Sequence, residues 1–127
     1  MLSDHRISAV ICSTNLDRTR DFYENKLGLS LSPETIKNHL LYELGTDGTL
    51  LIYGRPAGNK ADHTQVRFWT TQIEADVKDL ADRGVVFEDY DFPTFKTIDH
   101  IATTAGIGKS AWFKDPDGNI LALFQPE

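Results

Sequence analysis

Apolar and polar residues alternate near the start of the chain. Over residues 7–13 the period of two is typical of a β-strand, whose successive side chains point to opposite faces. One face carries Ile7, Ala9 and Ile11, and the other carries Ser8, Val10 and Cys12. We expect the first face to pack under a helix and the second face to line a cavity.

Apolar residues at helical spacing predict that a helix follows this strand. Thr14 or Asn15 can cap its first turn, and Gly28 supplies the stop at its end. Its buried face is expected to hold Leu16, Thr19, Phe22, Tyr23 and Leu27. Short strands then fit residues 29–32, 39–44 and 49–54, with turn residues between them. The first segment therefore reads β-α-β-β-β.

The same order restarts after a polar linker at residues 55–62. A strand fits residues 65–71, a helix with Ile73 and Val77 on its apolar face ends at Gly84, and a strand fits residues 85–90. A hairpin closes the chain, with strands at 111–114 and 120–124 around the turn Asp-Pro-Asp-Gly-Asn. We therefore predict an α+β fold of two β-α-β-β-β modules in a single domain over residues 1–127. Module one covers about residues 5–54 and module two about residues 63–126.

Three landmarks support this duplication, because they recur in the same order in both halves. They are Asn15-Leu16 with Gln72-Ile73, Leu27-Gly28-Leu29 with Arg83-Gly84-Val85, and the Asp-Gly pairs at 47–48 and 117–118. Two half-open sheets can bury apolar surface by pairing, so we expect concave faces that enclose a cup-shaped cavity of mixed sheets. The second half has an additional segment at residues 91–108. It either covers the mouth of the cavity or is a surface loop whose aromatic residues pack down.

Composition argues against several classes of partner. The 127-residue chain has a net charge of −6 and no run of basic residues, which disfavours nucleic acid and an anionic membrane surface. No apolar stretch approaches the roughly 18 residues that span a bilayer. Residues 1–15 lack the apolar core of a secretion signal. Cys12 is the single cysteine, so no internal disulfide forms, and we expect a cytoplasmic protein.

Two motifs in combination resemble the vicinal oxygen chelate (VOC) superfamily, the group of glyoxalases, bleomycin-resistance proteins and ring-cleaving dioxygenases. Phe22-Tyr23 lies shortly before Leu27-Gly28, and Phe-x-Asp-Pro-Asp-Gly-Asn occupies residues 113–119. The resemblance extends over about residues 7–125 and implies the glyoxalase-like fold of paired modules. It also implies a homodimer, because many relatives dimerise.

The resemblance further implies metal-ligand positions on the first and last strand of each module. In this sequence they hold Ser8, Ile52, Gln65 and Ala122, with Leu51 in place of Ile52 if the register differs by one. Serine and amide groups are weak ligands for a divalent ion, and aliphatic side chains cannot ligate. We therefore predict no metal and no cofactor. His63 is a further candidate ligand but has no carboxylate partners in the pattern, so a metal-dependent lyase or dioxygenase ranks last.

Strand alternation directs polar and aromatic side chains toward the expected cavity. The candidate ligand-binding residues are Ser8, Val10, Gln65, Arg67, Trp69, Trp112 and Phe124, with Trp112 and Phe113 competing for the inward face. An inward arginine requires an anionic partner, and tryptophan supplies a flat apolar wall. Arg67 and Trp69 together suit a small aromatic or anionic molecule. In the competing interpretation, Arg67 pairs with an internal carboxylate and Trp69 belongs to the core.

Proton transfer by His100 or Cys12 gives the alternative function, a metal-independent isomerase or lyase. The pKa of an unperturbed histidine lies near neutrality, which suits general acid–base catalysis. A cysteine nucleophile requires a base beside it, and no spacing in the sequence pairs Cys12 with one. The competing interpretations are a solvated loop residue for His100 and a small buried apolar residue for Cys12.

Overall fold

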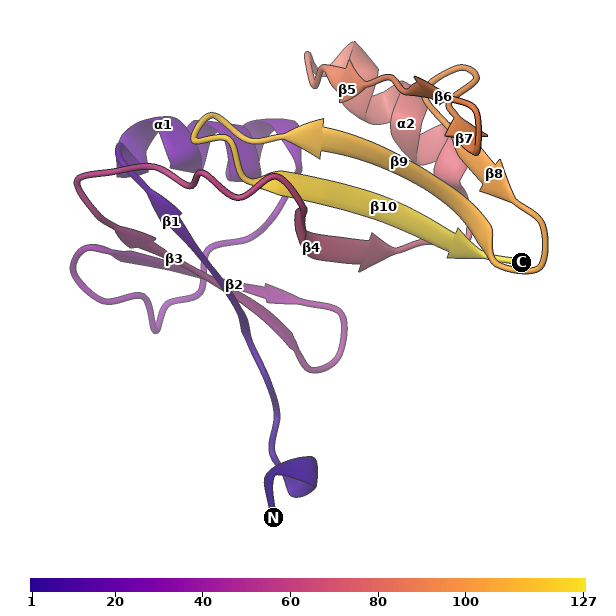
Figure 1. Cartoon of the computed structure of the whole chain (residues 1–127). Helices are drawn as coiled ribbons and strands as arrows, with labels where there is room; N and C mark the ends of the chain where they lie inside the picture. The colour runs from indigo at the N-terminus through magenta and orange to yellow at the C-terminus, as the bar shows by residue number, and fades with distance from the viewer. The chain divides into compact units, whose positions relative to one another are not determined.

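Strands dominate the structure, a computed structural model that describes all residues from 1 to 127 (Figure 1). Two α-helices accompany ten strands, which confirms the predicted α+β class. The chain divides into two compact units, one of residues 1–60 with 116–118 and the other of residues 61–115 with 119–127. A single domain with the predicted module boundaries stays a prediction. Neither α-helix has the length and apolar character needed to cross a membrane.

The first unit contains a three-stranded sheet. Its strands are β1 (Ala9–Ser13), β2 (His39–Leu44) and β3 (Gly48–Gly54). They lie in the order β1-β3-β2, with β1 parallel and β2 antiparallel to β3. The strand predicted at residues 29–32 is reduced to a single bridge between Leu31 and Tyr42. A short 3-10 turn, η1 (Leu2–Asp4), precedes β1.

Strand β1 is shorter than predicted. It begins at Ala9, so the expectation that Ile7 packs under the helix is wrong, and Ile7 is 83% exposed. The pairing of β1 with β3 begins at Ala9 and Leu50. One residue before each of these, the side-chain hydroxyls of Ser8 and Thr49 hydrogen-bond to each other. Ile11 is buried, as expected of its face.

A cap fixes the start of the first helix. Helix α1 (Leu16–Arg20) is preceded by Asn15, whose side-chain oxygen accepts a hydrogen bond from the Arg18 backbone N–H at 3.1 Å. This contact satisfies one of the backbone donors that the first turn of a helix leaves without a partner. The cap predicted at Thr14 or Asn15 is therefore formed by Asn15.

The predicted helix continues as a π-helical turn, η2 (Asp21–Lys26). A backbone hydrogen bond of 3.0 Å from Leu27 N–H to the Phe22 carbonyl spans five residues, as a π-turn requires. Phe22 and Tyr23 are adjacent in sequence and both buried, with ring centroids 5.3 Å apart. The stop at Gly28 is present, with φ of 78°.

The second unit repeats the strand order of the first. Its elements are β4 (Thr64–Trp69), α2 (Ile73–Asp82), β5 (Phe87–Glu88), β6 (Asp91–Phe92), β7 (Phe95–Lys96), β8 (Ala102–Thr104), β9 (Gly108–Lys114) and β10 (Ile120–Pro126). The main sheet has the order β4-β10-β9-β5. In each unit the first strand runs parallel to the last, which pairs antiparallel with the strand before it. This shared topology supports the internal duplication.

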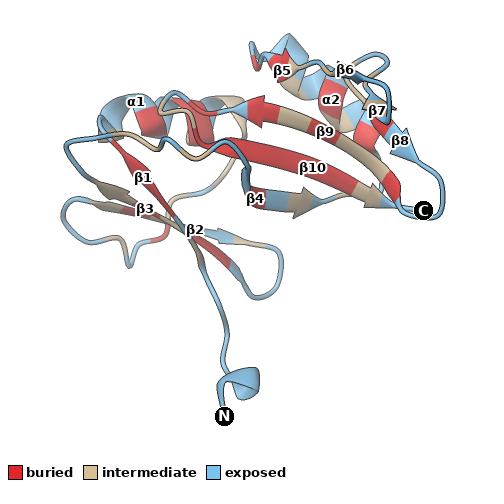
Figure 2. Ribbon diagram, in the orientation of Figure 1, coloured by how far each residue is buried: buried red, intermediate tan, exposed pale blue.

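The predicted closing hairpin is formed by β9 and β10, and it carries the core of the second unit. Strand β10 is buried along most of its length (Figure 2). Its turn is closed by a hydrogen bond of 3.0 Å from the Asp115 backbone N–H to the Asn119 carbonyl. Gly118 in this turn has φ of 82°, a conformation that costs glycine little. Ile73 and Val77 of α2 are buried, as the helical spacing predicts.

Residues 91–108, for which two interpretations were open, contain regular structure of their own. Strands β6 and β7 form a small hairpin, and β8 pairs with β9. Between β7 and β8, Asp99 and His100 adopt φ of 51° and 71°, inside a turn closed by two backbone hydrogen bonds between Ile98 and Ile101. The segment is an ordered extension of the second unit.

Candidate functional site

Strand register in the second unit gathers the predicted side chains on one sheet face. Strand β10 pairs Ala122 with Arg67 and Phe124 with Trp69, while β9 pairs Trp112 with Ala122. We call this surface the arginine face; it consists of Arg67, Trp69, Ser110, Trp112, Ala122 and Phe124. Phe113, which alternates with Trp112, is 1% exposed and lies on the opposite face. Of these two residues, Trp112 is therefore the one that shares the sheet face of Arg67.

Arg67 is held by aromatic rings and by no carboxylate. Its guanidinium carbon lies 4.8 Å from the centre of the Trp69 ring and 4.4 Å from the centre of the Phe124 ring. The two rings meet edge to face, with centroids 5.2 Å apart. Among the 127 described residues, none forms a hydrogen bond or ion pair with the Arg67 side chain. Trp69 is 66% exposed, so it is not a core residue.

A hollow of about 400 Å³ lies beside Arg67. It is lined by Thr64, Gln65, Val66, Arg67, Ser110, Trp112 and Ala122. Among these residues Ala122 contributes an apolar side chain, Trp112 an indole and Arg67 a guanidinium. A planar group can lie against the indole while an acceptor reaches the guanidinium, because arginine presents its N–H donors in a planar fork.

Further aromatic rings support Trp112. Tyr90 and Phe95 contact its ring edge to face, with centroids 5.5 Å and 5.4 Å away. Burial, followed by the charge of Glu88, raises the pKa of Tyr90, so its hydroxyl stays protonated at neutral pH. The sequence analysis did not include Tyr90 or Phe95 in the site. Their aromatic character within the long segment was the available signal, but no periodicity connects them to Trp112.

Gln65 belongs to the hollow, but its side chain also has a structural role. The register of β4 against β10 shifts between Ile120 and Leu121, which lie opposite Thr64 and Val66, so Gln65 is the additional residue of a bulge in β4. The Gln65 side-chain oxygen accepts a hydrogen bond of 3.1 Å from the Ile120 backbone N–H. Its amide nitrogen lies 3.3 Å from Nδ1 of the exposed His63. The Gln65 side chain thus bonds to the backbone of β10 at the bulge.

The candidates in the first unit lie on one face of β1. Val10 pairs with Leu51 and is 54% exposed, and Ser8 bonds to Thr49 on the same side. Ile52 pairs with Ile11 and is fully buried on the opposite face, so of the two candidates for that family ligand position Leu51 is the one that shares the face of Ser8 and Val10. A role of Ser8 or Val10 in ligand binding stays a prediction.

The residues at the family ligand positions do not fit a divalent metal. Those positions hold Ser8, Leu51, Gln65 and Ala122, which together offer one hydroxyl and one amide but neither imidazole nor carboxylate. Such a neutral donor set does not hold a divalent ion. Nowhere in residues 1–127 do three or more His, Cys, Asp or Glu side chains form a group that could hold one.

The two candidate proton-transfer residues belong to different units. Cys12, in β1 of the first unit, is buried and is not in a disulfide. His100, in the second unit, stacks on Phe87 with centroids 5.6 Å apart, and its Nδ1 lies 2.9 Å from Asp89 Oδ1. Neither residue lines the hollow beside Arg67. A catalytic role of His100 or Cys12 stays a prediction.

Known proteins match the chain through one family model and through structure. The model described as Glyoxalase/Bleomycin resistance protein/Dioxygenase superfamily matches residues 5–123. No curated protein matches the sequence. TnmS3, an antibiotic binding protein from Streptomyces sp. CB03234, is 23% identical with a TM-score of 0.70, over 97% of this chain and 96% of that one. A glyoxalase family protein from Bacillus anthracis is 15% identical with a TM-score of 0.72, over 97% and 95% of the chains.

A protein named as an enzyme is also among the structural matches. Lactoylglutathione lyase from Agrobacterium tumefaciens is 17% identical with a TM-score of 0.66, over 95% of this chain and 92% of that one. At these identities the structural likeness establishes a common fold and nothing about ligand or reaction.

Proposed function

Because the chain belongs to the Glyoxalase/Bleomycin resistance protein/Dioxygenase superfamily, we propose that it binds a small aromatic molecule with an anionic group, without a metal. One observation carries the proposal: the Arg67 guanidinium lies against two aromatic rings and has no acidic partner within the chain. An arginine paired with an internal carboxylate would be a structural feature. An arginine that is oriented but not neutralised is prepared for an anion from outside.

The arrangement favours an aromatic carboxylate over other anions. The guanidinium of Arg67 lies against Trp69 and Phe124 and has no hydrogen-bond partner in the chain, and its planar fork of N–H donors matches the paired oxygens of a carboxylate. The indole of Trp112, across the hollow, offers a surface for a flat ring. The net charge of −6 repels anions in general, so affinity for one must come from this local geometry.

The proposed absence of a metal is supported by the donor set at the family ligand positions. Two of the four side chains are aliphatic, and the Gln65 oxygen accepts a hydrogen bond from the backbone at the β4 bulge. The name of TnmS3 describes it as an antibiotic binding protein, which is consistent with a binding role on this fold. The proposal for this chain rests on Arg67 and not on that name.

Calorimetric titration with 2-naphthoate and its uncharged analogue 2-naphthamide tests the proposal in the presence of EDTA. We expect 2-naphthoate to bind the wild-type protein at least about tenfold more tightly than 2-naphthamide, equivalent to about 1.4 kcal/mol for the charged contact. Arg67→Gln should remove this preference. Arg67→Lys should recover the preference for 2-naphthoate only in part. An ammonium lacks the flat face that stacks on aromatic rings and the planar fork that binds two oxygens at once.

Arg83→Gln provides the matched control. Arg83 follows α2 and pairs with Asp79 at 3.3 Å on an exposed surface, so its substitution removes the same charge away from the site. The control should bind 2-naphthoate as the wild type does. Equal binding of the two probes by the wild type, or unchanged binding of 2-naphthoate by Arg67→Gln, would contradict the proposal.

A further inference from the structure

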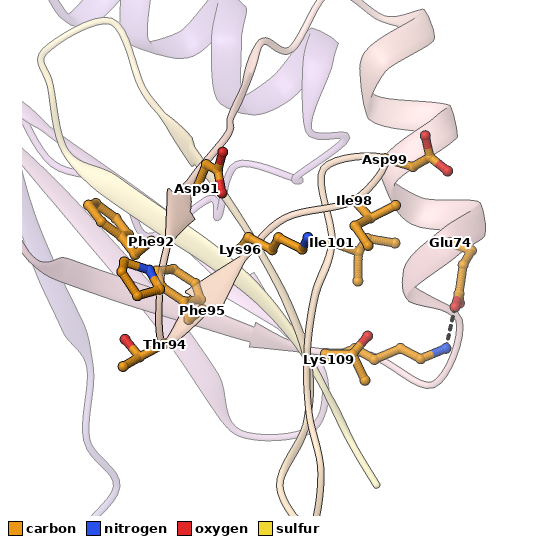
Figure 3. A pocket seen from close by; sticks show the side chains of 12 residues that line it. Glu74, Asp91, Phe92, Thr94, Phe95, Lys96, Ile98, Asp99, Ile101 and Lys109 are labelled. Carbon is orange, nitrogen blue, oxygen red and sulfur yellow. Dashed lines mark hydrogen bonds and ion pairs between the residues drawn. The ribbon is translucent and has the colours of Figure 1, made fainter.

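A second hollow, of about 950 Å³, lies in the second unit and shares no lining residue with the hollow beside Arg67. Figure 3 shows its walls, which come from the β6–β7 hairpin, the turn at residues 98–101, Lys109 of β9 and Glu74 of α2. We call it the flank hollow. Lys109 alternates with Ser110 on β9, so its side chain lies on the sheet face opposite to the arginine face, whereas Phe95, another lining residue, contacts Trp112 of the arginine face.

Charges of both signs line the flank hollow without a partner. Lys109 forms an ion pair with Glu74 and is thereby neutralised, as the dashed line in Figure 3 marks. Lys96, Asp91 and Asp99 form no ion pair and no side-chain hydrogen bond anywhere in residues 1–127. In Figure 3 the Lys96 side chain extends toward Ile101. One ammonium and two carboxylates are therefore available to a ligand.

Apolar side chains lie among these charges. Ile98 is 66% exposed and Phe92 is 54% exposed, and Ile101 completes the apolar part of the wall. Exposed side chains of this size gain free energy when a ligand covers them. A ligand that fits must therefore have an apolar body in addition to its charges.

The turn that carries Asp99 is fixed in place. His100, next to Asp99, stacks on Phe87 and lies 2.9 Å from the Asp89 carboxylate, so the turn is tied to β5 and its neighbourhood. Both Asp99 and His100 have positive φ, a conformation in which Asp and His are more frequent than most non-glycine residues. Asp99 is thus one of the residues that line the hollow, in a turn that His100 connects to Phe87 and Asp89.

From these observations we infer that the flank hollow binds a short peptide with free termini and apolar side chains. The terminal ammonium contacts Asp99 or Asp91, the terminal carboxylate contacts Lys96, and the side chains cover Ile98 and Phe92. A simple anion would meet two unpaired carboxylates, and a simple cation would meet Lys96. The volume is that of sites for small ligands rather than for a single ion.

Three forms of one dipeptide test the inference by calorimetry: Leu-Leu, N-acetyl-Leu-Leu and Leu-Leu-amide. Each blocked form removes one terminal charge and keeps the apolar side chains. We expect Leu-Leu to bind at least about fivefold more tightly than either blocked form. In Lys96→Gln, Leu-Leu and Leu-Leu-amide should bind equally, and in Asp99→Asn the difference between Leu-Leu and N-acetyl-Leu-Leu should decrease.

Lys78→Gln is the matched control, because Lys78 lies on the exposed side of α2 and pairs with Asp82 at 3.0 Å. This variant should bind Leu-Leu more tightly than N-acetyl-Leu-Leu and Leu-Leu-amide, as the wild type is expected to do. Equal affinity of the wild type for the three forms, or an unchanged preference in Lys96→Gln, would overturn the inference. The Arg67→Gln variant separates this inference from the proposed function. It should lose naphthoate binding at the arginine face and still bind the three peptides with the wild-type differences in affinity.

Discussion

Asp117 ties the turn of the closing hairpin to the residues before α1. Its Oδ1 accepts hydrogen bonds from the backbone N–H and the hydroxyl of Thr14 at 3.0 Å and 2.6 Å, and the Arg18 guanidinium lies 3.0 Å away. The side chain is 2% exposed. Burial alone would raise the pKa of Asp117, but the donors of Thr14 and the charge of Arg18 outweigh it and hold the pKa below its usual 3.8.

Stability should therefore decrease in acid through Asp117. A carboxyl whose pKa is lowered by folding stabilises the protein above its unfolded pKa, and this contribution is lost as the pH falls through the folded pKa. We expect Asp117→Asn to lower the free energy of unfolding at pH 6 by about 1.5–3 kcal/mol, the value of a hydrogen-bonded charge. The variant should also lose less stability than the wild type below pH 4.

Urea unfolding between pH 3 and pH 6 measures both effects. Asp82→Asn removes a carboxylate whose side chain is 67% exposed and should change stability little. If Asp117→Asn unfolds with the same pH dependence as the wild type, Asp117 does not contribute the acid-sensitive stability.

Arg67 and Gln65 illustrate how far residue-level prediction extends. Alternation placed Arg67, Trp69 and Phe124 on one sheet face, because a regular strand keeps its period of two, and it left the choice between Trp112 and Phe113 open. It did not predict that Gln65 lies at a bulge and pairs with the backbone, because a register shift depends on the partner strand. It also left Ile52 and Leu51 open, because the face of each depends on the register, which pairs Leu51 with Val10.

At the scale of elements, the end of the β9–β10 hairpin depends on one glycine. Gly108 pairs with Pro126 and has φ of 145°. A Cβ atom at this position would lie 2.2 Å from the Gln125 carbonyl oxygen, which is part of the backbone and cannot yield easily. Gly106, two residues earlier, also has positive φ, of 80°, but a Cβ there would have no atom within 4 Å.

These two glycines form a matched pair. Gly106→Ala should cost about 1–2 kcal/mol of unfolding free energy, the strain of a left-handed conformation. Gly108→Ala should cost about 2–5 kcal/mol, because overpacking against the backbone is added to strain. Denaturant unfolding of both variants measures the difference, and equal destabilisation would show that the contact with Gln125 has no energetic consequence.

Helices and strands were predicted well where the apolar–polar pattern extended over enough residues to show its period, or where a turn motif marked their ends. Strand β2, the helix α2 and the closing hairpin were located from alternation, helical spacing and the Asp-Pro-Asp-Gly-Asn turn. The π-turn η2 was not predicted, since its bonding depends on burying Phe22 and Tyr23 together. The strands within residues 91–108 have two or three residues each, too few to show a period.

At the scale of the whole molecule, the duplicated strand order identified from three short landmarks is present in both units. The landmarks mark helix and strand ends: Asn15 caps α1, and Gly28 and Gly84 follow the helical segments with positive φ. The expected homodimer stays a prediction that sedimentation equilibrium would test. No local pattern in one chain specifies a partner surface.

The claim that Arg67 and its aromatic neighbours bind an anionic aromatic ligand without a metal is tested most directly by NMR. Trp69 and Trp112 are the only two tryptophans, so one indole N–H signal reports on the ring beside the Arg67 guanidinium and the other on the lining of the hollow. In EDTA, we predict that 2-naphthoate shifts both signals saturably, that 2-naphthamide does not, and that Arg67→Gln abolishes the shifts. Signals that 2-naphthoate leaves unmoved, or that move only when a divalent ion is supplied, would contradict the claim.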